Sequence, residues 1–455
     1  MIAATAERRL GGVDLALLII FFIGIYLGVS IPVAQGVPFP SAPSGLAGIV
    51  LLWRRRDRIV PLHLSVLLMV IVIYIAAILS ATDYGFLGKR FTGLIQLVYS
   101  LVIGYAMFLT ILEASRKQLA GLFFWFLVFI VVGCFLEQYT PLKAVSDAVR
   151  VTIYDHGVYE SDLRDQMLYG KVRPKLFTSE PSAVTFGYTL FLSAWFIITA
   201  TRWRLLIFAA FLGIGLVAMP GPTLLLALLV LPPYYFFITP LVTPRHRLIP
   251  GYRTAILIVG AILLIVFVLL GTTLFAERFN QIASGEDPSF FYRVIGPVLV
   301  AMEVLRVYPW AGAGLTGEPF INELVINTFV KSAHYSAAWK FSKVSEVITN
   351  YFWLHWIYLG LVWGIVVLAA HTAWLRVLSV PSVLFCWAFW VIFGQASGAY
   401  VGPKTWVVLL LAAGLSIVCT RVSGPTMVPV PQARHQIRQL RVGNRLRNPG
   451  LAHHP

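Results

Sequence analysis

Charged residues are scarce in this chain. Lys, Arg, Asp and Glu together make up 12% of its 455 residues, about half the share found in an average soluble domain. Hydrophobic residues make up 59%, and the mean hydropathy is +0.83. A soluble globular protein is therefore excluded. Runs of about 20 apolar residues, long enough to cross a bilayer, recur along the chain. The composition predicts an all-α polytopic membrane protein, because spanning helices satisfy their own backbone polar groups.

Cysteine and the usual metal motifs are also rare. The three cysteines, Cys134, Cys386 and Cys419, lie far apart in or beside apolar runs. An odd, widely spaced set excludes a disulfide framework and a cysteine metal cluster. The chain has no Asp-x-Asp pair and no His-rich ligand set. We therefore expect no cofactor and no metal site.

Acidic residues are few as well, 19 against 35 Lys and Arg, so the formal net charge is +16. This excess could indicate a nucleic-acid partner, but the basic residues occur in alternate connections between apolar runs. The positive-inside rule then predicts that both termini are cytoplasmic. The charge orients the protein and attracts anionic membrane lipids, and we expect no nucleic-acid partner.

Hydropathy predicts about twelve transmembrane helices. They cover residues 13–33, 40–53, 60–81, 92–114, 119–136, 183–201, 205–219, 223–241, 254–275, 351–371, 377–394 and 405–420. Residues 1–420 thus form one transmembrane domain. The remainder, 421–455, contains six arginines and no acidic residue, which predicts a disordered basic cytoplasmic tail.

Two connections, 137–182 and 276–350, are much longer than the usual helix–helix loop. Both are predicted to be external. They are rich in aromatic residues, which is atypical of disorder. Short amphipathic helices at the membrane surface, for example over Tyr292–Val307, suit this composition better.

The first loop ends in charged residues just before an apolar run. Arg173 and Lys175 precede it, and Glu180 comes directly before Pro181. Arginine offers a planar fork of donors that suits phosphate oxygens, and a carboxylate can accept a proton from a hydroxyl group. The alternative is a cluster that anchors lipid headgroups, followed by a helix-initiating Glu-Pro pair.

The second loop offers matching residues. Arg293 lies on the predicted amphipathic segment, and Gly312 and Gly314 allow close approach of a ligand to the backbone. Asn350 stands at the mouth of the next span, and His334 lies in the loop before it. A solvated arginine and an ordinary glycine-rich turn are the alternative interpretation.

Taken together, these residues resemble the bacterial O-antigen and exopolysaccharide polymerase and ligase family. Arg173 with "FTSEPS" resembles the family's Arg-x-x-x-Phe-x-x-Glu-Pro-Ser motif. Arg293 followed by "YPWAGAG" is similar to a second motif, and Asn350 with Leu354 to a third. The resemblance covers roughly 95–395. It departs from the family at Thr349, where many members carry a histidine, which favours the polymerase branch over the ligase branch.

The resemblance implies a C-type glycosyltransferase-like fold in the bacterial inner membrane, with its active site on the periplasmic side. The implied reaction transfers a glycan chain from undecaprenyl diphosphate to the terminal sugar of another lipid-linked repeat unit. Arg173 and Arg293 would stabilise the diphosphate, Glu180 would be the base with His334 in reserve, and Lys175, Gly312, Gly314 and Asn350 would bind substrate. Chain-length regulator and flippase proteins are implied partners.

Three rival functions stay open: O-antigen ligase, a twelve-span secondary transporter and a non-catalytic subunit of a polysaccharide export complex. Transporters place binding groups on broken helices near the middle of the membrane. Here charges are almost absent from the predicted spans, so the sequence favours the glycosyltransferase.

Overall fold

The structure is a computed structural model. It describes residues 9–34, 37–81, 83–154, 159, 161–243, 251–274, 276, 291–331 and 347–421. The chain divides after Thr420, and the fold described here is that of the part before this point. The predicted tail, 421–455, lies outside the described residues apart from Arg421.

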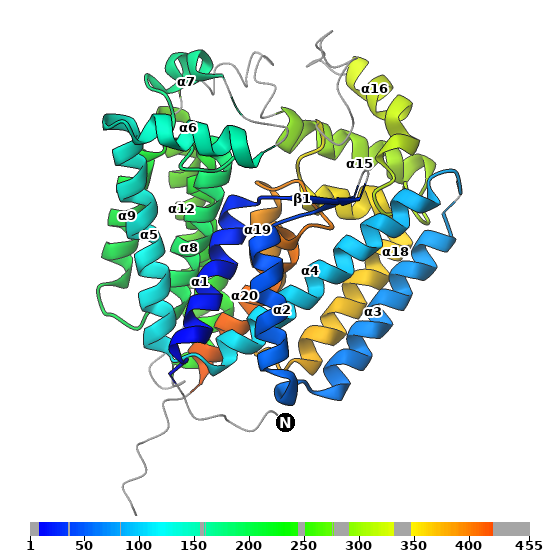
Figure 1. The fold of residues 1–455 in the computed structure, drawn as a ribbon, viewed down its shortest axis with the longest axis horizontal. Helices are drawn as coiled ribbons and strands as arrows, with labels where there is room; N and C mark the ends of the chain where they lie inside the picture. Colours follow the sequence, from blue (N-terminus) through cyan, green and yellow to red (C-terminus); the bar gives the residue numbers. More distant parts are fainter. Residues whose placement is uncertain are drawn as a thin grey trace, which may run out of the picture. The chain divides into compact units, whose positions relative to one another are not determined.

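Helices make up most of this part of the chain (Figure 1). In chain order they are α1 (Gly12–Leu27), α2 (Ala42–Arg54), α3 (Pro61–Leu79), α4 (Leu87–Glu113), α5 (Arg116–Tyr139), α6 (Leu142–Ile153), α7 (Asp162–Tyr169), α8 (Pro181–Ile198), α9 (Arg204–Ala218), α10 (Leu226–Pro233), α11 (Thr239–Val242), α12 (Tyr252–Leu274), α15 (Gly296–Val307), α16 (Asn322–Val330), α18 (Tyr351–Val377), α19 (Val383–Gly394) and α20 (Pro403–Thr420). Short 3₁₀ turns are η1 (Arg56–Arg58), η2 (Pro222–Leu225) and η6 (Glu318–Ile321), and π-helical turns are η3 (Tyr234–Ile238) and η5 (Phe291–Ile295).

Helix starts follow from local chemistry. The Ser115 hydroxyl accepts a hydrogen bond from the Gln118 amide at the start of α5. Asn350 and Ser382 cap α18 and α19 in the same way. Each side chain satisfies an amide that has no partner within the helix. Proline occupies the first turn of α8, where its missing N–H costs nothing.

The structure confirms the prediction of a helical membrane protein. Within the described residues, seven helices are long and apolar enough to cross a membrane, and each overlaps a predicted span: Pro61–Leu79, Leu87–Glu113, Arg116–Tyr139, Pro181–Ile198, Pro222–Val242, Tyr351–Val377 and Pro403–Thr420. Four further apolar helices are shorter: Gly12–Leu27, Arg204–Ala218, Leu257–Leu270 and Val383–Gly394. The total of twelve spans stays a prediction.

The first predicted span, 13–33, is longer than the helix in the structure. α1 ends at Leu27, and residues after it form an antiparallel hairpin of β1 (Ile31–Ala34) and β2 (Val37–Phe39). The left-handed Gly28 ends α1, which hydropathy alone would continue. α2 agrees with the predicted span 40–53 within two residues, and its 13 residues extend about 20 Å, less than the bilayer core of about 30 Å.

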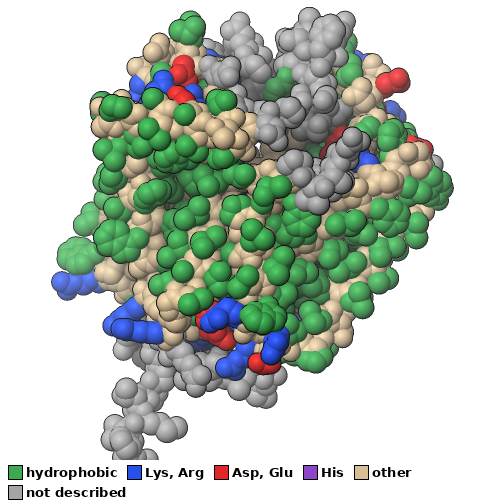
Figure 2. Space-filling view, viewed as in Figure 1, with side chains coloured by type: hydrophobic (Ala, Val, Ile, Leu, Met, Phe, Trp, Pro, Cys, Tyr) green, Lys and Arg blue, Asp and Glu red, His purple; other side chains and the backbone are tan. Residues whose placement is uncertain are grey.

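Charged side chains gather at the two ends of the helices, and apolar side chains cover the surface between them (Figure 2). At the end where α2 and α4 stop, Arg54 and Arg55 pair with Asp14, and Arg55 also pairs with Glu113. The long loops, with α6, α7, α15 and α16, lie at the opposite end (Figure 1). Between them, residues such as Leu68, Trp125 and Phe129 are exposed. An apolar belt of this kind suits a hydrocarbon environment.

α8, α20 and α4 form the centre of the helical bundle. α20 packs on both α4 and α8, and α5 packs on α8. α8 and α20 are buried along most of their length. Aromatic rings fill the space between α1, α5 and α8. The ring centres of Phe22 and Phe123 lie 5.4 Å apart, and those of Phe126 and Phe191 lie 4.7 Å apart. The site described below lies at the start of α8, so this centre supports it directly.

α18 is kinked at Gly360, whose φ is 64° and ψ −169°. The loop before η6 fits into the kink, with the Ala313 amide donating to the Ile357 carbonyl at 2.8 Å and the Leu361 amide to the Pro309 carbonyl at 2.7 Å. The hydrogen bonds that the kink breaks within the helix are therefore replaced by bonds to the loop.

We predict that Gly360→Ala destabilises the protein by at least about 2 kcal/mol, because its backbone angles suit only glycine and the added Cβ meets crowded backbone. That Cβ would lie 2.6 Å from the Gly312 nitrogen. Thermal unfolding of the purified protein in detergent measures the effect. Gly121→Ala is the control, because Gly121 lies in α5 with no atom within 4 Å of the added Cβ. Equal unfolding temperatures for the two variants would contradict this account.

Candidate functional site

Arg173 is held by α7. α7 ends at Gly170, whose φ of 69° lets the chain turn back on the helix. The Arg173 guanidinium then reaches Asp165, with Nη2 at 2.8 Å and Nε at 2.9 Å from Oδ1. Asp165 is fully buried, and the Arg173 side chain is 12% exposed. Both nitrogens contact the same carboxylate oxygen, and burial keeps water from competing, so the direction of the guanidinium is fixed.

Two tyrosines complete the surroundings of Arg173. The Tyr159 hydroxyl donates to Asp165 Oδ1 at 2.8 Å, and the guanidinium lies 4.6 Å from the Tyr169 ring centre. Burial lowers the pKa of Arg173, but Tyr169, Asp165 and Tyr159 outweigh it, so the pKa is raised. Burial and the bond to Asp165 raise the pKa of Tyr159. Arg173 therefore stays a cation and Tyr159 a neutral phenol at neutral pH.

The segment from Arg173 to Glu180 has no regular structure, yet it is largely buried. Arg150 donates to the carbonyls of Thr178 at 2.7 Å and Ser179 at 2.9 Å. From the other side, the Glu137 carboxylate accepts the amides of Lys175 and Leu176. Two buried charged side chains thus satisfy backbone groups that no secondary structure serves.

This segment also holds two non-glycine residues in the left-handed region, Leu176 at φ 34° and Phe177 at φ 64°. Each such residue costs about 1 to 3 kcal/mol and persists only where the surroundings impose it. Here the Ser146 hydroxyl accepts the Phe177 amide at 3.0 Å, and Tyr26 donates to the Leu176 carbonyl. Strain of this kind is typical of functional segments.

Glu180 is the residue before α8, in extended conformation, and Pro181 begins the helix. The Ser182 hydroxyl donates to its carboxylate. Lys404, at the start of α20, interacts with Glu180 electrostatically. The carboxylate is 45% exposed, so it faces open space while its neighbours orient it.

Arg293 approaches from the second loop. Its side chain is 23% exposed, and Nη2 lies 4.0 Å from Glu180 Oε1. The start of α18 positions its backbone: Asn350 Nδ2 donates to the Arg293 carbonyl and to Gln395 Oε1, both at 2.9 Å. Thr349 donates to the Tyr292 carbonyl next to it. A helix over the predicted amphipathic stretch is confirmed by η5 and α15.

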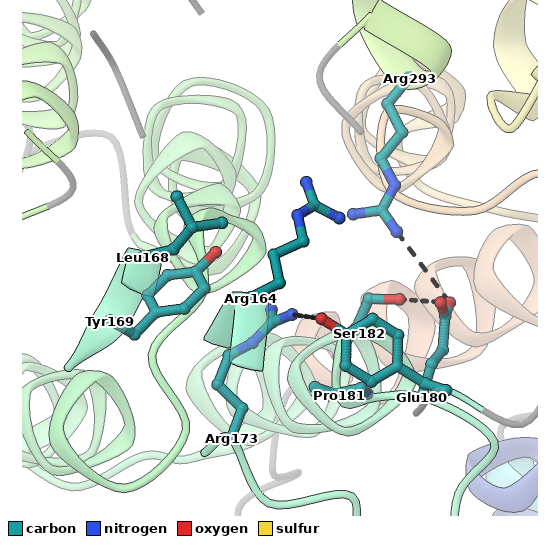
Figure 3. Close-up of a pocket in the computed structure, with 9 residues that line it drawn as sticks. Arg164, Leu168, Tyr169, Arg173, Glu180, Pro181, Ser182 and Arg293 are labelled. Atoms are coloured by element: carbon teal, nitrogen blue, oxygen red, sulfur yellow. Dashed lines mark hydrogen bonds and ion pairs between the residues drawn. The ribbon is translucent and has the colours of Figure 1, made fainter. Parts of the chain in front are cut away.

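One cavity of about 100 Å³ joins the two loops. It is lined by Tyr159, Arg164, Leu168, Tyr169, Arg173, Glu180, Pro181, Ser182 and Arg293. Figure 3 shows Arg164, Arg173 and Arg293 directed into it from different elements, with Glu180 and Ser182 on its floor. Among the described lining residues three are arginines, and Glu180 is the only one with a carboxylate. The volume is room for about three water molecules at roughly 30 Å³ each. A small anion such as a phosphoryl group fits both the size and the charge.

The structure places the other predicted residues elsewhere. Lys175 is buried, pairs with Asp162 at 2.9 Å, and lines a second cavity. Gly312 and Gly314 approach the α18 backbone and Arg90, respectively. Asn350 is fully buried and holds the Arg293 backbone. His334 lies outside the described residues.

Sequence reasoning missed several residues of this site. Arg164, Asp165, Tyr159 and Tyr169 come from α7 and its flank, and Lys404 comes from the start of α20. In the sequence α7 shows only charges of both signs, Asp162, Arg164 and Asp165, which do not by themselves indicate a site. Nothing in the sequence links Lys404 to Glu180. Within the described ranges, no three His, Cys, Asp or Glu side chains gather as a metal site.

Comparisons with protein-family models, curated proteins and solved structures give no match to this chain.

We predict that Asp165→Asn destabilises the protein by about 3 kcal/mol, because it leaves the buried Arg173 cation without its counter-charge. Asn has nearly the same shape, so the change removes charge and little volume. Thermal unfolding in detergent measures the loss. Asp57→Asn, at a side chain that is 91% exposed, serves as the control and leaves stability unchanged. Similar unfolding temperatures for both variants would show that the Asp165 pair does not hold this loop.

Proposed function

We propose that this chain is a membrane glycosyltransferase, a polysaccharide polymerase. It transfers a glycan chain from undecaprenyl diphosphate to the terminal sugar of another lipid-linked repeat unit. The observation that carries the proposal is the single cavity lined by Arg173, Glu180 and Arg293. These residues come from two loops far apart in the sequence, and they are the ones that the family resemblance selects.

The arginines suit a diphosphate leaving group. When the bond between the anomeric carbon and the phosphate oxygen breaks, the oxygen keeps the electron pair, and negative charge grows on the diphosphate. Arg173 is fixed by Asp165 before substrate arrives, so it needs no reorganisation to meet that charge. Arg293 Nη2 lies 4.0 Å from Glu180 Oε1. Its planar guanidinium suits two phosphate oxygens at once.

Glu180 suits the role of base. The attacking sugar hydroxyl forms the new bond to the anomeric carbon and gives up its proton, and the Glu180 carboxylate takes that proton. The Glu180 side chain is 45% exposed and lines the cavity, and the Ser182 hydroxyl orients its carboxylate. The Arg293 guanidinium lies 4.0 Å from this carboxylate.

The proposed location follows from the charges at the two ends. The Arg54–Arg58 end would face the cytoplasm by the positive-inside rule. The cavity, at the start of α8, would then open on the periplasmic side of the inner membrane. A lipid-linked donor keeps its polyprenyl tail in the bilayer, so a phosphate site at the rim of the helical bundle is accessible to it.

The position of the cavity favours an enzyme over a secondary transporter. It lies between loops at one end of the helices, whereas transporters bind near the middle of the membrane. An O-antigen ligase would use the same donor and differ in its acceptor. Reconstitution with lipid-linked repeat units, with and without lipid A core, separates the two activities.

We predict that Arg293→Ala lowers the rate of elongation at least about a hundredfold, because one charge contact to the leaving group is lost. Purified protein in liposomes, supplied with undecaprenyl diphosphate-linked repeat units, reports elongation as a ladder of products on a gel. Arg306→Ala is the matched control, because Arg306 lies on α15 in the same loop and is 71% exposed.

Full-length polymer from Arg293→Ala would overturn the assignment.

Arg173 needs a milder change than alanine, since its removal also leaves Asp165 buried and unpaired. We expect Arg173→Lys to keep the fold and still lose activity, because lysine keeps the charge without the bidentate geometry.

Glu180→Gln removes the proton acceptor and keeps the shape of the side chain. We expect elongation to fall by about 10² to 10⁴-fold, with unchanged binding of the lipid-linked donor. Single-turnover elongation measures the chemical step, and co-purified lipid diphosphate measures binding. Glu303→Gln, at the surface of α15 beside Arg306, is the control. Normal elongation by Glu180→Gln would assign the base to another residue.

A further inference from the structure

A second cavity adjoins the first at Arg173, whose side chain lines both. Its volume is about 340 Å³, against about 100 Å³ for the arginine cavity. Small-molecule sites are typically about 300 to 1,000 Å³, so the second cavity is large enough for an organic ligand. It lies between the end of α5, the start of α6, α7 and residues 171–175.

Basic side chains line this second cavity, but most of them have a counter-charge. Lys143 and Lys175 share the Asp162 carboxylate, at 3.0 and 2.9 Å. Arg173 has Asp165. Among the described lining residues only Glu137 has a carboxylate, and it accepts the backbone amides of Lys175 and Leu176. The cavity wall is thus close to neutral apart from one group.

That group is Lys171. Across the described ranges, no carboxylate lies within ion-pairing distance of its ammonium, which donates to the Val217 carbonyl. Burial lowers the pKa of Lys171, as expected for a partly buried cation without a counter-ion. An anionic group in the cavity would supply the missing charge.

Neutral polar groups complete the wall. Gln138 donates to the Ala218 carbonyl at 2.5 Å, whereas its side-chain oxygen is buried and accepts no hydrogen bond. Gln166 and the 77% exposed Tyr139 also line the cavity. Amide groups that bond hydroxyls, beside an aromatic ring, are typical of sites that bind sugars. These groups give the wall a polar character without a further charge.

We propose that this second cavity binds an acidic sugar residue of the substrate, with its carboxylate at Lys171. Arg173 would then separate the sugar from the phosphate that the arginine cavity holds, which is the order in which the two groups occur in a sugar diphosphate. The inference rests on the proposed function and adds the class of sugar and the residues that select it.

The test uses the purified full chain in detergent and two probes, methyl β-glucuronide and methyl β-glucoside. Saturation-transfer NMR titrations measure the affinity of each. We expect the glucuronide to bind about tenfold or more tightly than the glucoside, because a charge-assisted contact distinguishes them. Lys171→Gln should remove that preference, and Lys171→Arg should retain it. Lys331→Gln, at an exposed lysine of the other loop, should change nothing.

Several results would overturn the inference. They are equal affinities of wild type for the two probes, an unchanged preference in Lys171→Gln, or loss of the preference in both Lys171 variants at a normal unfolding temperature. These results differ from the result that would overturn the proposed function, which is normal elongation by the Arg293→Ala variant. Arg293→Ala should still bind the glucuronide, because Arg293 does not line the second cavity.

Discussion

Buried irregular backbone is the constraint on which this site depends. Between α7 and α8 the chain runs without secondary structure through a largely buried region, where every backbone N–H and C=O needs a partner. Arg150 and Glu137 supply those partners from opposite sides. Each is a charge that would be costly to bury alone. The loop and the two charges therefore stabilise one another, and Arg173 and Glu180 are fixed in consequence.

The two arginines of the site are placed by different groups. Arg173 is anchored by a fully buried carboxylate at 2.8 Å. Asn350 fixes the backbone of Arg293, whose Nη2 lies 4.0 Å from Glu180. We infer that Arg173 provides a preorganised positive charge, and such a charge favours negative charge that develops during a reaction.

Several residues could be predicted from the sequence, and the reasons are physical. Arg173, Glu180 and Arg293 stand out because charge is rare in so apolar a chain, and the cavity brings all three together. Lys175 is only two residues from Arg173, but it lines the second cavity alone, and its ammonium pairs with Asp162, a contact that the sequence does not reveal. Asp165 could not be recognised, since its significance lies in an ion pair that the turn at Gly170 creates.

The bilayer explains why the sequence by itself determined the class of protein, most of the long helices and the ends at which charges gather. A hydrocarbon solvent imposes length and polarity on each segment separately, so these features can be predicted one segment at a time. Only the tertiary structure decided where α1 stops, that α18 bends around a glycine loop, and which charges meet. Burial and ion pairing join residues that are distant in the sequence, and such energies exist only once the helices have packed.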